Sequence, residues 1–249
     1  RAKRELEARK AVLETAIRLD FTHEAKSLKR VEVPDPNARI LAVDDEGGWL
    51  YYSASPENPT QRYLYRARLD GRGAMERLSP MGQFGTHSYN LAPGGRFAIH
   101  SFSSVSSPPV TELVRLPAHD VVRTLADNAA LKHRMGLLRR GPVRFTRVDA
   151  GNGVWLDGLV MYPADFDSTK KYPVLFMVYG EPAGQTATDS WGAIDPWHLM
   201  LTQMGYAVIT LDNRGTPSLR GRAWRKSVYR KIGPYAPEYP ADATRALGS

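Results

Sequence analysis

The sequence contains no cysteine among its 249 residues. This absence excludes disulfide bonds, thiolate metal sites and a cysteine nucleophile, although it does not identify the cellular compartment. The sequence also has no apolar run close to the roughly 20 residues that span a bilayer. Its charged N-terminus shows no apolar stretch followed by a small-residue cleavage site, so no secretory signal is visible. With 42% hydrophobic residues, the composition is typical of a globular protein.

Acidic residues are outnumbered, which gives a net charge of +8 and a pI near 9.7. A nucleic-acid-binding protein would need these basic residues gathered on one face. Most of them are scattered instead, and the densest groups lie in residues 1–10 and 220–231. We therefore expect no nucleic-acid partner, and a basic nucleic-acid-binding protein is the less favoured alternative. Binding that falls steeply with salt would favour that alternative.

The pattern of residues divides the chain into three segments. Residues 1–30 place apolar residues at a spacing close to that of an amphipathic helix. Residues 31–127 contain short β-rich runs separated by turn residues, which predicts an antiparallel meander suited to a sandwich, a barrel or propeller blades. The predicted strands are Ile40–Val43, Trp49–Ser53, Tyr63–Leu69, Arg96–Phe102 and Thr111–Leu116.

The remaining segment, residues 128–249, begins with a charged connector that favours a helix over Ala129–Arg140. Two strands are expected next, at Val143–Val148 and Val154–Tyr162. Two strongly apolar runs follow, Val174–Tyr179 and Tyr206–Leu211, with a predicted helix, Trp197–Met204, between them. Continuous apolar strands that alternate with helix indicate a sheet covered on both faces, hence an α/β fold.

Four stretches together carry a resemblance to the dipeptidyl peptidase IV branch of the prolyl oligopeptidase family, a family of serine peptidases. The stretches YYSASPENPTQRYLYRARLDG and GTHSYNLAPGGRFAIHSFSSVSSPPVTELVRL resemble the last blades of its β-propeller. The stretches KKYPVLFMVYGEPAGQ and WHLMLTQMGYAVITLDNRGTPSLRGRAWRKSVYRKIG resemble the beginning of the α/β-hydrolase domain of that family. The resemblance implies C-terminal propeller blades over residues 31–127 and the N-terminal part of an α/β-hydrolase domain over residues 128–249. It covers roughly residues 40–233.

Tyr179 is the candidate catalytic residue, because the resemblance implies that its hydroxyl helps to form an oxyanion hole. Attack on a peptide carbonyl places negative charge on oxygen, and a rigid phenol that remains protonated at neutral pH can stabilise it. The alternative is a tyrosine that packs its ring at the end of a strand and leaves its hydroxyl in water.

The residues around this tyrosine can be interpreted in two ways. Gly180 and Pro182 are expected to turn the chain away from the strand, and Glu181 stands where many family members have a second glycine. Glu181 is a weak candidate for binding the α-amino group of a substrate, and a solvated turn carboxylate is the favoured interpretation. The loop Asp212, Arg214 and Gly215 follows the second apolar strand, where we favour a structural ion pair between Asp212 and Arg214.

A serine peptidase of this fold needs a nucleophile within Gly-x-Ser-x-Gly, followed in the sequence by Asp and His. The sequence contains no such motif, and the six histidines lie outside the expected triad region. We interpret them as core or surface residues: His23, His87, His100, His119, His133 and His198. None has metal-ligand spacing, so we expect neither a metal nor a cofactor. The sequence therefore predicts a truncated chain that is inactive alone.

The overall prediction is part of a bacterial-type dipeptidyl-peptidase-like enzyme that acts on peptide substrates. Its full-length relatives are expected to form homo-oligomers, and both the bacterial cytoplasm and the periplasm remain open as its location. A non-catalytic, propeller-derived module that binds peptides without turnover is the main alternative from another functional class. The paired glutamates of early propeller blades, which hold the substrate N-terminus in that family, have no counterpart in this sequence.

Overall fold

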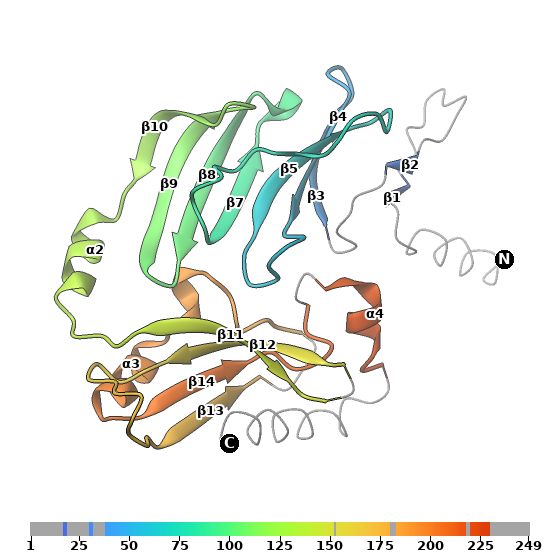
Figure 1. The fold of residues 1–249 in the computed structure, drawn as a ribbon. Coiled ribbons are helices and arrows are strands. Elements are labelled where there is room, and N and C mark those ends of the chain that lie inside the picture. The colour runs from blue at the N-terminus through green and yellow to red at the C-terminus, as the bar shows by residue number, and fades with distance from the viewer. Residues whose placement is uncertain are drawn as a thin grey trace.

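The structure is a computed structural model that describes residues 17–18, 30–31, 38–151, 153–179, 183–217 and 220–229. Three four-stranded sheets form most of the described chain, as Figure 1 shows. Two of them stand side by side in the upper half, and the third lies below them. The molecule is thus mostly β-sheet, with short helices concentrated around the third sheet.

The first sheet is an antiparallel meander with the strand order β3-β4-β5-β6. Its strands are β3 (Arg39–Asp44), β4 (Trp49–Ala54), β5 (Tyr63–Arg68) and β6 (Glu76–Arg77). Side chains alternate between the two faces along each strand. In β4, Leu50 and Tyr52 pack with Tyr65 on one face, while Tyr51 joins a cluster with Leu64 on the other.

The second sheet is also an antiparallel meander, with the order β7-β8-β9-β10. Its strands are β7 (Thr86–Leu91), β8 (Phe97–Ser104), β9 (Ser107–Arg115) and β10 (Asp120–Ala126), and a short 3₁₀ turn, η1 (Pro93–Gly95), joins β7 to β8. Ala98 and Val114 contribute to the same buried cluster as Tyr51 and Leu64 of the first sheet. Buried apolar surface therefore holds the two meanders together, as expected for adjacent blades.

The third sheet is mixed, with the order β11-β12-β14-β13, and its one parallel pair is β13 with β14. Its strands are β11 (Val143–Asp149), β12 (Trp155–Met161), β13 (Val174–Val178) and β14 (Ala207–Leu211). A 3₁₀ turn, η2 (Trp191–Ala193), and a helix, α3 (Pro196–Gln203), connect the parallel strands, and α4 (Gly221–Lys226) follows β14. Both predicted apolar runs are confirmed as strands, and the helix between them is confirmed as α3.

The predicted helix over residues 1–30 falls largely outside the described residues. At Ile17–Arg18 the structure has a short strand, β1, in place of the expected helix, because its backbone pairs antiparallel with β2 (Arg30–Val31). Among the helices that the structure describes, none has the length and apolar composition needed to cross a bilayer.

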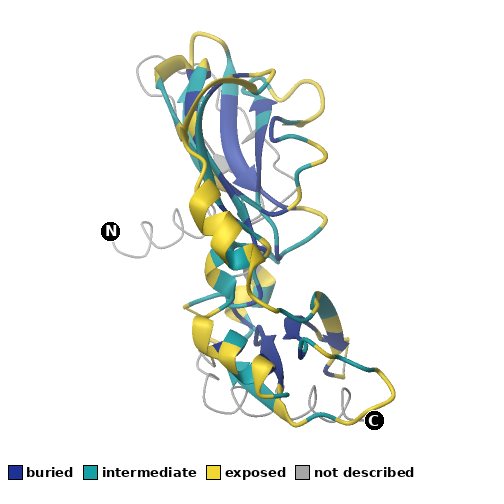
Figure 2. Cartoon of the chain, turned by 90° about the vertical axis from the view of Figure 1, so that its left-hand side faces the viewer, coloured by how far each residue is buried: buried dark blue, intermediate teal, exposed yellow. Residues whose placement is uncertain are grey.

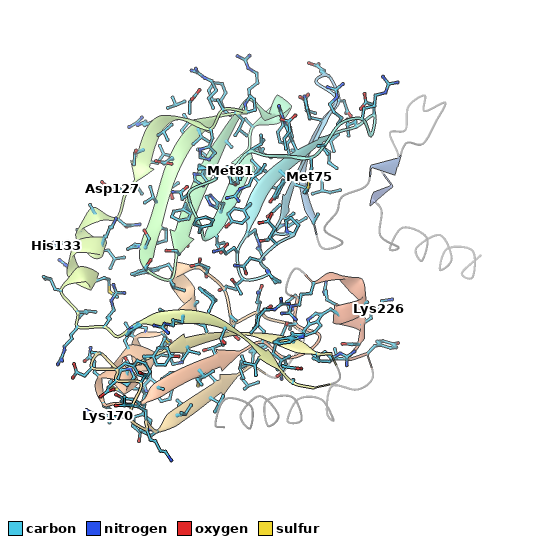
Figure 3. All side chains as sticks on the ribbon, in the orientation of Figure 1. Met75, Met81, Asp127, His133, Lys170 and Lys226 are labelled. Carbon is cyan, nitrogen blue, oxygen red and sulfur yellow. The ribbon has the colours of Figure 1, made fainter. Side chains whose placement is uncertain are left out.

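The connector between the second and third sheets is confirmed as helical over α2 (Ala129–Gly136). No residue of α2 is buried, and every residue of β10 before it is exposed. Figure 2 shows this exposed helix along the side that joins the upper and lower halves, and Figure 3 marks its position with Asp127 and His133. The connector therefore has little tertiary packing of its own.

We expect chymotrypsin to cleave after Leu131, Leu137 or Leu138, which are exposed in the connector, before it cleaves within the segment 174–211. The reason is that exposed backbone with few buried contacts opens locally at low cost in free energy. The measurement is a time course of limited digestion, with each fragment identified by mass spectrometry. Early cleavage within β13 or β14, with the connector intact, would contradict this expectation.

Candidate functional site

Tyr179 follows β13 directly, at the carboxyl end of the parallel strand pair. Tyr179 is 51% exposed, so it is partly accessible from solvent. Ligands of α/β sheets bind at this edge, because the loops that follow neighbouring parallel strands meet there. The described geometry therefore puts a phenol donor where the fold places functional groups.

A pocket of about 510 Å³ opens beside Tyr179, between β13, β14 and α3. Met177, Thr210 and His198 line it together with the loop that leads to α3. His198 is buried, and burial lowers the pKa of its imidazole, so the ring is neutral at pH 7. Its Nδ1 and the hydroxyl of Thr210 are buried without a hydrogen-bond partner within the described residues. The pocket thus contains polar atoms that could bind a polar group.

The loop of residues 183–191 closes one side of the pocket and touches Tyr179. A Cβ placed on Gly184 would lie 3.3 Å from Cε1 of the Tyr179 ring. This distance is tighter than an ordinary van der Waals contact, so the absence of a side chain at Gly184 lets the backbone approach the ring. The start of the 183–191 loop therefore forms one wall against the phenol.

Asp212, which follows β14, fixes the middle of the 183–191 loop. Its Oδ1 accepts hydrogen bonds from the backbone N–H of Thr186 at 2.6 Å, from the Thr186 hydroxyl at 2.9 Å and from the N–H of Ala187 at 3.1 Å. Burial raises the pKa of the Asp212 carboxyl, and these three hydrogen bonds oppose that shift. Asp212 thus fixes the neighbouring loop through hydrogen bonds, and the ion pair between Asp212 and Arg214 stays a prediction.

Gly215 lies in the turn after β14 with a positive φ of +91°. A Cβ at this position would come within 2.5 Å of Cγ2 of Val228, so the turn needs glycine both for its conformation and for the close approach. Arg214, beside it, is partly buried. The three other predicted loop residues, Gly180, Glu181 and Pro182, lie outside the described residues.

The 183–191 loop also contacts both upper sheets, a feature that sequence analysis missed. Gln185 donates from Nε2 to the carbonyl oxygen of Pro59 at 2.9 Å, and the N–H of Asp189 donates to the carbonyl of Thr60 at 2.7 Å. The N–H of Trp191 donates to the hydroxyl of Ser103 at 3.3 Å. The same loop that touches Tyr179 therefore rests on both meanders.

The histidines that the structure describes lie in three settings. His133 is exposed on α2, and His198 is buried against the pocket. His87 and His100 are buried in the second meander, where their rings stack with centroids 5.2 Å apart, and His119 packs edge-on against His100. No group of three His, Cys, Asp or Glu side chains in the described part of the chain is arranged to hold a metal. His23 lies outside the described residues.

Comparison with known proteins connects this geometry to a family. Residues 30–109 match the model of the dipeptidyl peptidase IV (DPP IV) N-terminal region. The chain is 31% identical over 201 residues to a probable dipeptidyl-aminopeptidase B from Metarhizium robertsii, covering 77% of this chain and 21% of that protein. A probable dipeptidyl-aminopeptidase B from Coccidioides posadasii is 29% identical over 209 residues, covering 83% of this chain and 22% of its own length.

Among solved structures, the chain is similar to dipeptidyl peptidase 4 from Porphyromonas gingivalis, with a TM-score of 0.78 and 30% sequence identity. That similarity covers 89% of this chain and 30% of the other. The likeness extends across all three sheets because it takes in most of the described residues, which confirms the predicted combination of propeller blades and an α/β sheet. The chain spans about a fifth of the length of the curated relatives that it matches.

Proposed function

The chain is of the dipeptidyl peptidase IV type and covers part of such a protein, and we propose that this protein releases dipeptides from polypeptide N-termini. We assign residues 31–127 to C-terminal propeller blades and residues 128–249 to the first part of the peptidase domain. Tyr179 is the residue of this segment that acts in the reaction. Its hydroxyl donates a hydrogen bond to the oxyanion that forms when a serine attacks the scissile carbonyl.

The observation that carries this proposal is the position of Tyr179 at the mouth of the 510 Å³ pocket. The residue is half exposed, and its ring lies against Gly184 of a loop that several hydrogen bonds hold in place. A donor held in place before the reaction stabilises developing charge without the cost of reorganising at the transition state. An exposed tyrosine on a free surface would lack this support.

The sequence contains no Gly-x-Ser-x-Gly motif, so the nucleophile has to come from another part of the full-length protein. We expect the 249-residue segment to bind no fluorophosphonate probe covalently, because that probe reacts with an activated serine. Losing the nucleophile and its base removes most of the rate, since these residues act as a unit. Labelling of the segment would show that this division of roles is wrong.

We expect the full-length protein to hydrolyse an aminoacyl-prolyl p-nitroanilide and to release the dipeptide. The same substrate with its N-terminus acetylated is the matched control, because it retains the scissile bond but lacks the free amine. Chromogenic rates and mass spectrometry of the products are the measurements. Equal hydrolysis of the two substrates would contradict dipeptidyl specificity. Peptide binding without any turnover would favour a non-catalytic binding module.

A further inference from the structure

Asp189 lies in the 183–191 loop, which follows β13 of the third sheet, and its carboxylate contacts both upper meanders. Oδ2 accepts a hydrogen bond from Nε2 of Gln61, in the loop before β5, at 2.9 Å. Oδ1 accepts from the backbone N–H of Val105, in the β8–β9 hairpin, at 3.1 Å. These two partners lie 128 and 84 positions away in the sequence, so the contact forms only in the complete tertiary arrangement.

The surroundings of Asp189 keep this carboxylate in one orientation. The residue is only 6% exposed, and its own N–H donates to the carbonyl oxygen of Thr60 at 2.7 Å. Gln61 is held in turn by the hydroxyl of Tyr63, which donates to its Oε1 at 2.6 Å. That hydrogen bond directs the amide N–H of Gln61 toward Asp189, because the carbonyl oxygen of an amide can only accept.

The 183–191 loop connects Asp189 to Tyr179. Both belong to one continuous stretch, and the intervening loop is fixed by Asp212 at Thr186 and lies against the Tyr179 ring at Gly184. The side chain of Asp189 makes two of the hydrogen bonds that seat the loop on the meanders, one to each meander. Removing it would leave the Val105 N–H without its acceptor and weaken the attachment of the loop to both meanders.

We propose that Asp189 is a positioning residue for Tyr179, through which the two propeller blades hold the oxyanion donor in its reactive orientation. This inference rests on the proposed function of Tyr179. It assigns the blades a role in the rate of the chemical step, carried by the 183–191 loop. Asp189 itself does not contact the reacting atoms.

The first test is a double-mutant cycle in the full-length protein, with Asp189→Ala, Tyr179→Phe and both changes together. Asp189→Ala should lower kcat about 10- to 100-fold with little change in KM, because small displacements of a catalytic group are costly. In the Tyr179→Phe background it should lower kcat by less than about threefold, since the hydroxyl that it positions is already missing. Asp167→Ala, in an exposed turn of the same sheet, is the control and should keep the wild-type kcat.

The second test exchanges the donor, Gln61, and the acceptor, Asp189, of one hydrogen bond. It remains informative even if the Asp189→Ala variant fails to fold. Gln61→Glu alone places two carboxylates against each other and should lower kcat about tenfold or more. Adding Asp189→Asn restores an amide–carboxylate hydrogen bond in the reverse direction while still accepting from Val105. We expect the double variant to recover to within about threefold of wild type.

The outcomes separate the two proposals. Equal losses of kcat from Asp189→Ala in both backgrounds, or no recovery in the exchanged pair, would overturn the positioning role and leave the function of Tyr179 standing. A wild-type kcat for Tyr179→Phe would overturn both. A loss expressed in KM with unchanged kcat would assign Asp189 to substrate binding and also overturn the positioning role.

Discussion

Replacing Tyr179 with phenylalanine in the full-length protein is expected to lower kcat by about 10²- to 10³-fold, a loss of about 3 to 4 kcal/mol of transition-state stabilisation. The change removes one oxygen atom and keeps the ring that packs against Gly184. KM should change little, because the hydroxyl bonds to the charge that develops only in the transition state. Steady-state kinetics with the aminoacyl-prolyl substrate provide the measurement.

Tyr206→Phe is the matched control for this substitution. Tyr206 precedes β14, so it lies at the opposite end of the parallel strand pair from Tyr179, and it is 36% exposed. We expect its kcat and thermal stability to equal those of wild type. If Tyr179→Phe also keeps the wild-type kcat, Tyr179 is a packed aromatic at a strand end and the oxyanion donor is another group.

Two strands with strongly apolar sequences, Val174–Val178 and Ala207–Leu211, were predictable. β14 is buried along its whole length, as expected for a strand that is covered on both faces, whereas β13 lies at the edge of the sheet and none of its residues is buried. Strands with weaker patterns were missed. β7 reads Thr-His-Ser-Tyr-Asn-Leu, whose buried residues include a histidine, and β10 is exposed along its whole length. Neither offers the apolar alternation on which the prediction relied.

The start of β9 was predicted too late in the sequence because the strand contains two prolines. β9 begins at Ser107 and includes Pro108 and Pro109, although the sequence predicted a start at Thr111. The register between β8 and β9 shifts between Phe102 and Ser104, opposite these prolines. A bulge tolerates residues that cannot donate to the ladder, so the strand continues through them. Local sequence carries no sign of this irregularity.

The site was predictable only in part, for a related reason. Tyr179 and Asp212 follow apolar strands, and that position in the sequence made them candidates. Asp189 lies in a polar loop, where nothing in the neighbouring residues distinguishes it from a solvated carboxylate. Its partners come from two separate sheets, and only the folded arrangement brings them together.

The cluster of histidines in the second meander was also not predictable from the sequence, because the register between its strands brings these residues together. Tyr89 pairs with His100 across β7 and β8, and His100 pairs with Glu112 across β8 and β9. His87 Nε2 lies 3.0 Å from the carbonyl oxygen of Gln83, and His87 Nδ1 lies 2.9 Å from His100 Nε2. Since the carbonyl can only accept, His87 donates from Nε2 and accepts at Nδ1 from the N–H of His100. These hydrogen bonds are compatible with two neutral rings.

This neutral pair is expected to make the second meander sensitive to acid. Burial lowers the pKa of His87 to about 4 and that of His100 to about 3, from an ordinary value of 6.5. Arg77 near His87 and His119 near both rings oppose their protonation further, whereas Glu112 lies 3.6 Å from Nδ1 of His100 on the other side. The unfolded state therefore binds more protons than the folded state between pH 6.5 and these lower values.

The sign follows from this difference in proton binding. The contribution of these histidines to stability is fully present above about pH 6.5 and is lost as the pH drops toward 4. Over this range the folding equilibrium constant falls by a factor of up to about ten per pH unit for each histidine. A pKa lowered from 6.5 to about 4 corresponds to about 3 kcal/mol of stability for His87. We therefore expect β7, β8 and β9 to open before the first meander, whose strands contain no histidine.

Hydrogen exchange of the full-length protein, corrected for the intrinsic effect of pH on exchange, measures this opening strand by strand. Protection of peptides from β7 and β8 should fall from pH 7 to pH 4 relative to peptides from β4 and β5. His100→Gln keeps a donor for Nδ1 of His87 but does not titrate, so it should reduce the slope by about one proton. His133→Gln, on the exposed α2 helix, is the matched control and should retain the wild-type slope. An unchanged slope in His100→Gln, or an equal reduction in His133→Gln, would show that the buried imidazoles are not the source of the acid sensitivity.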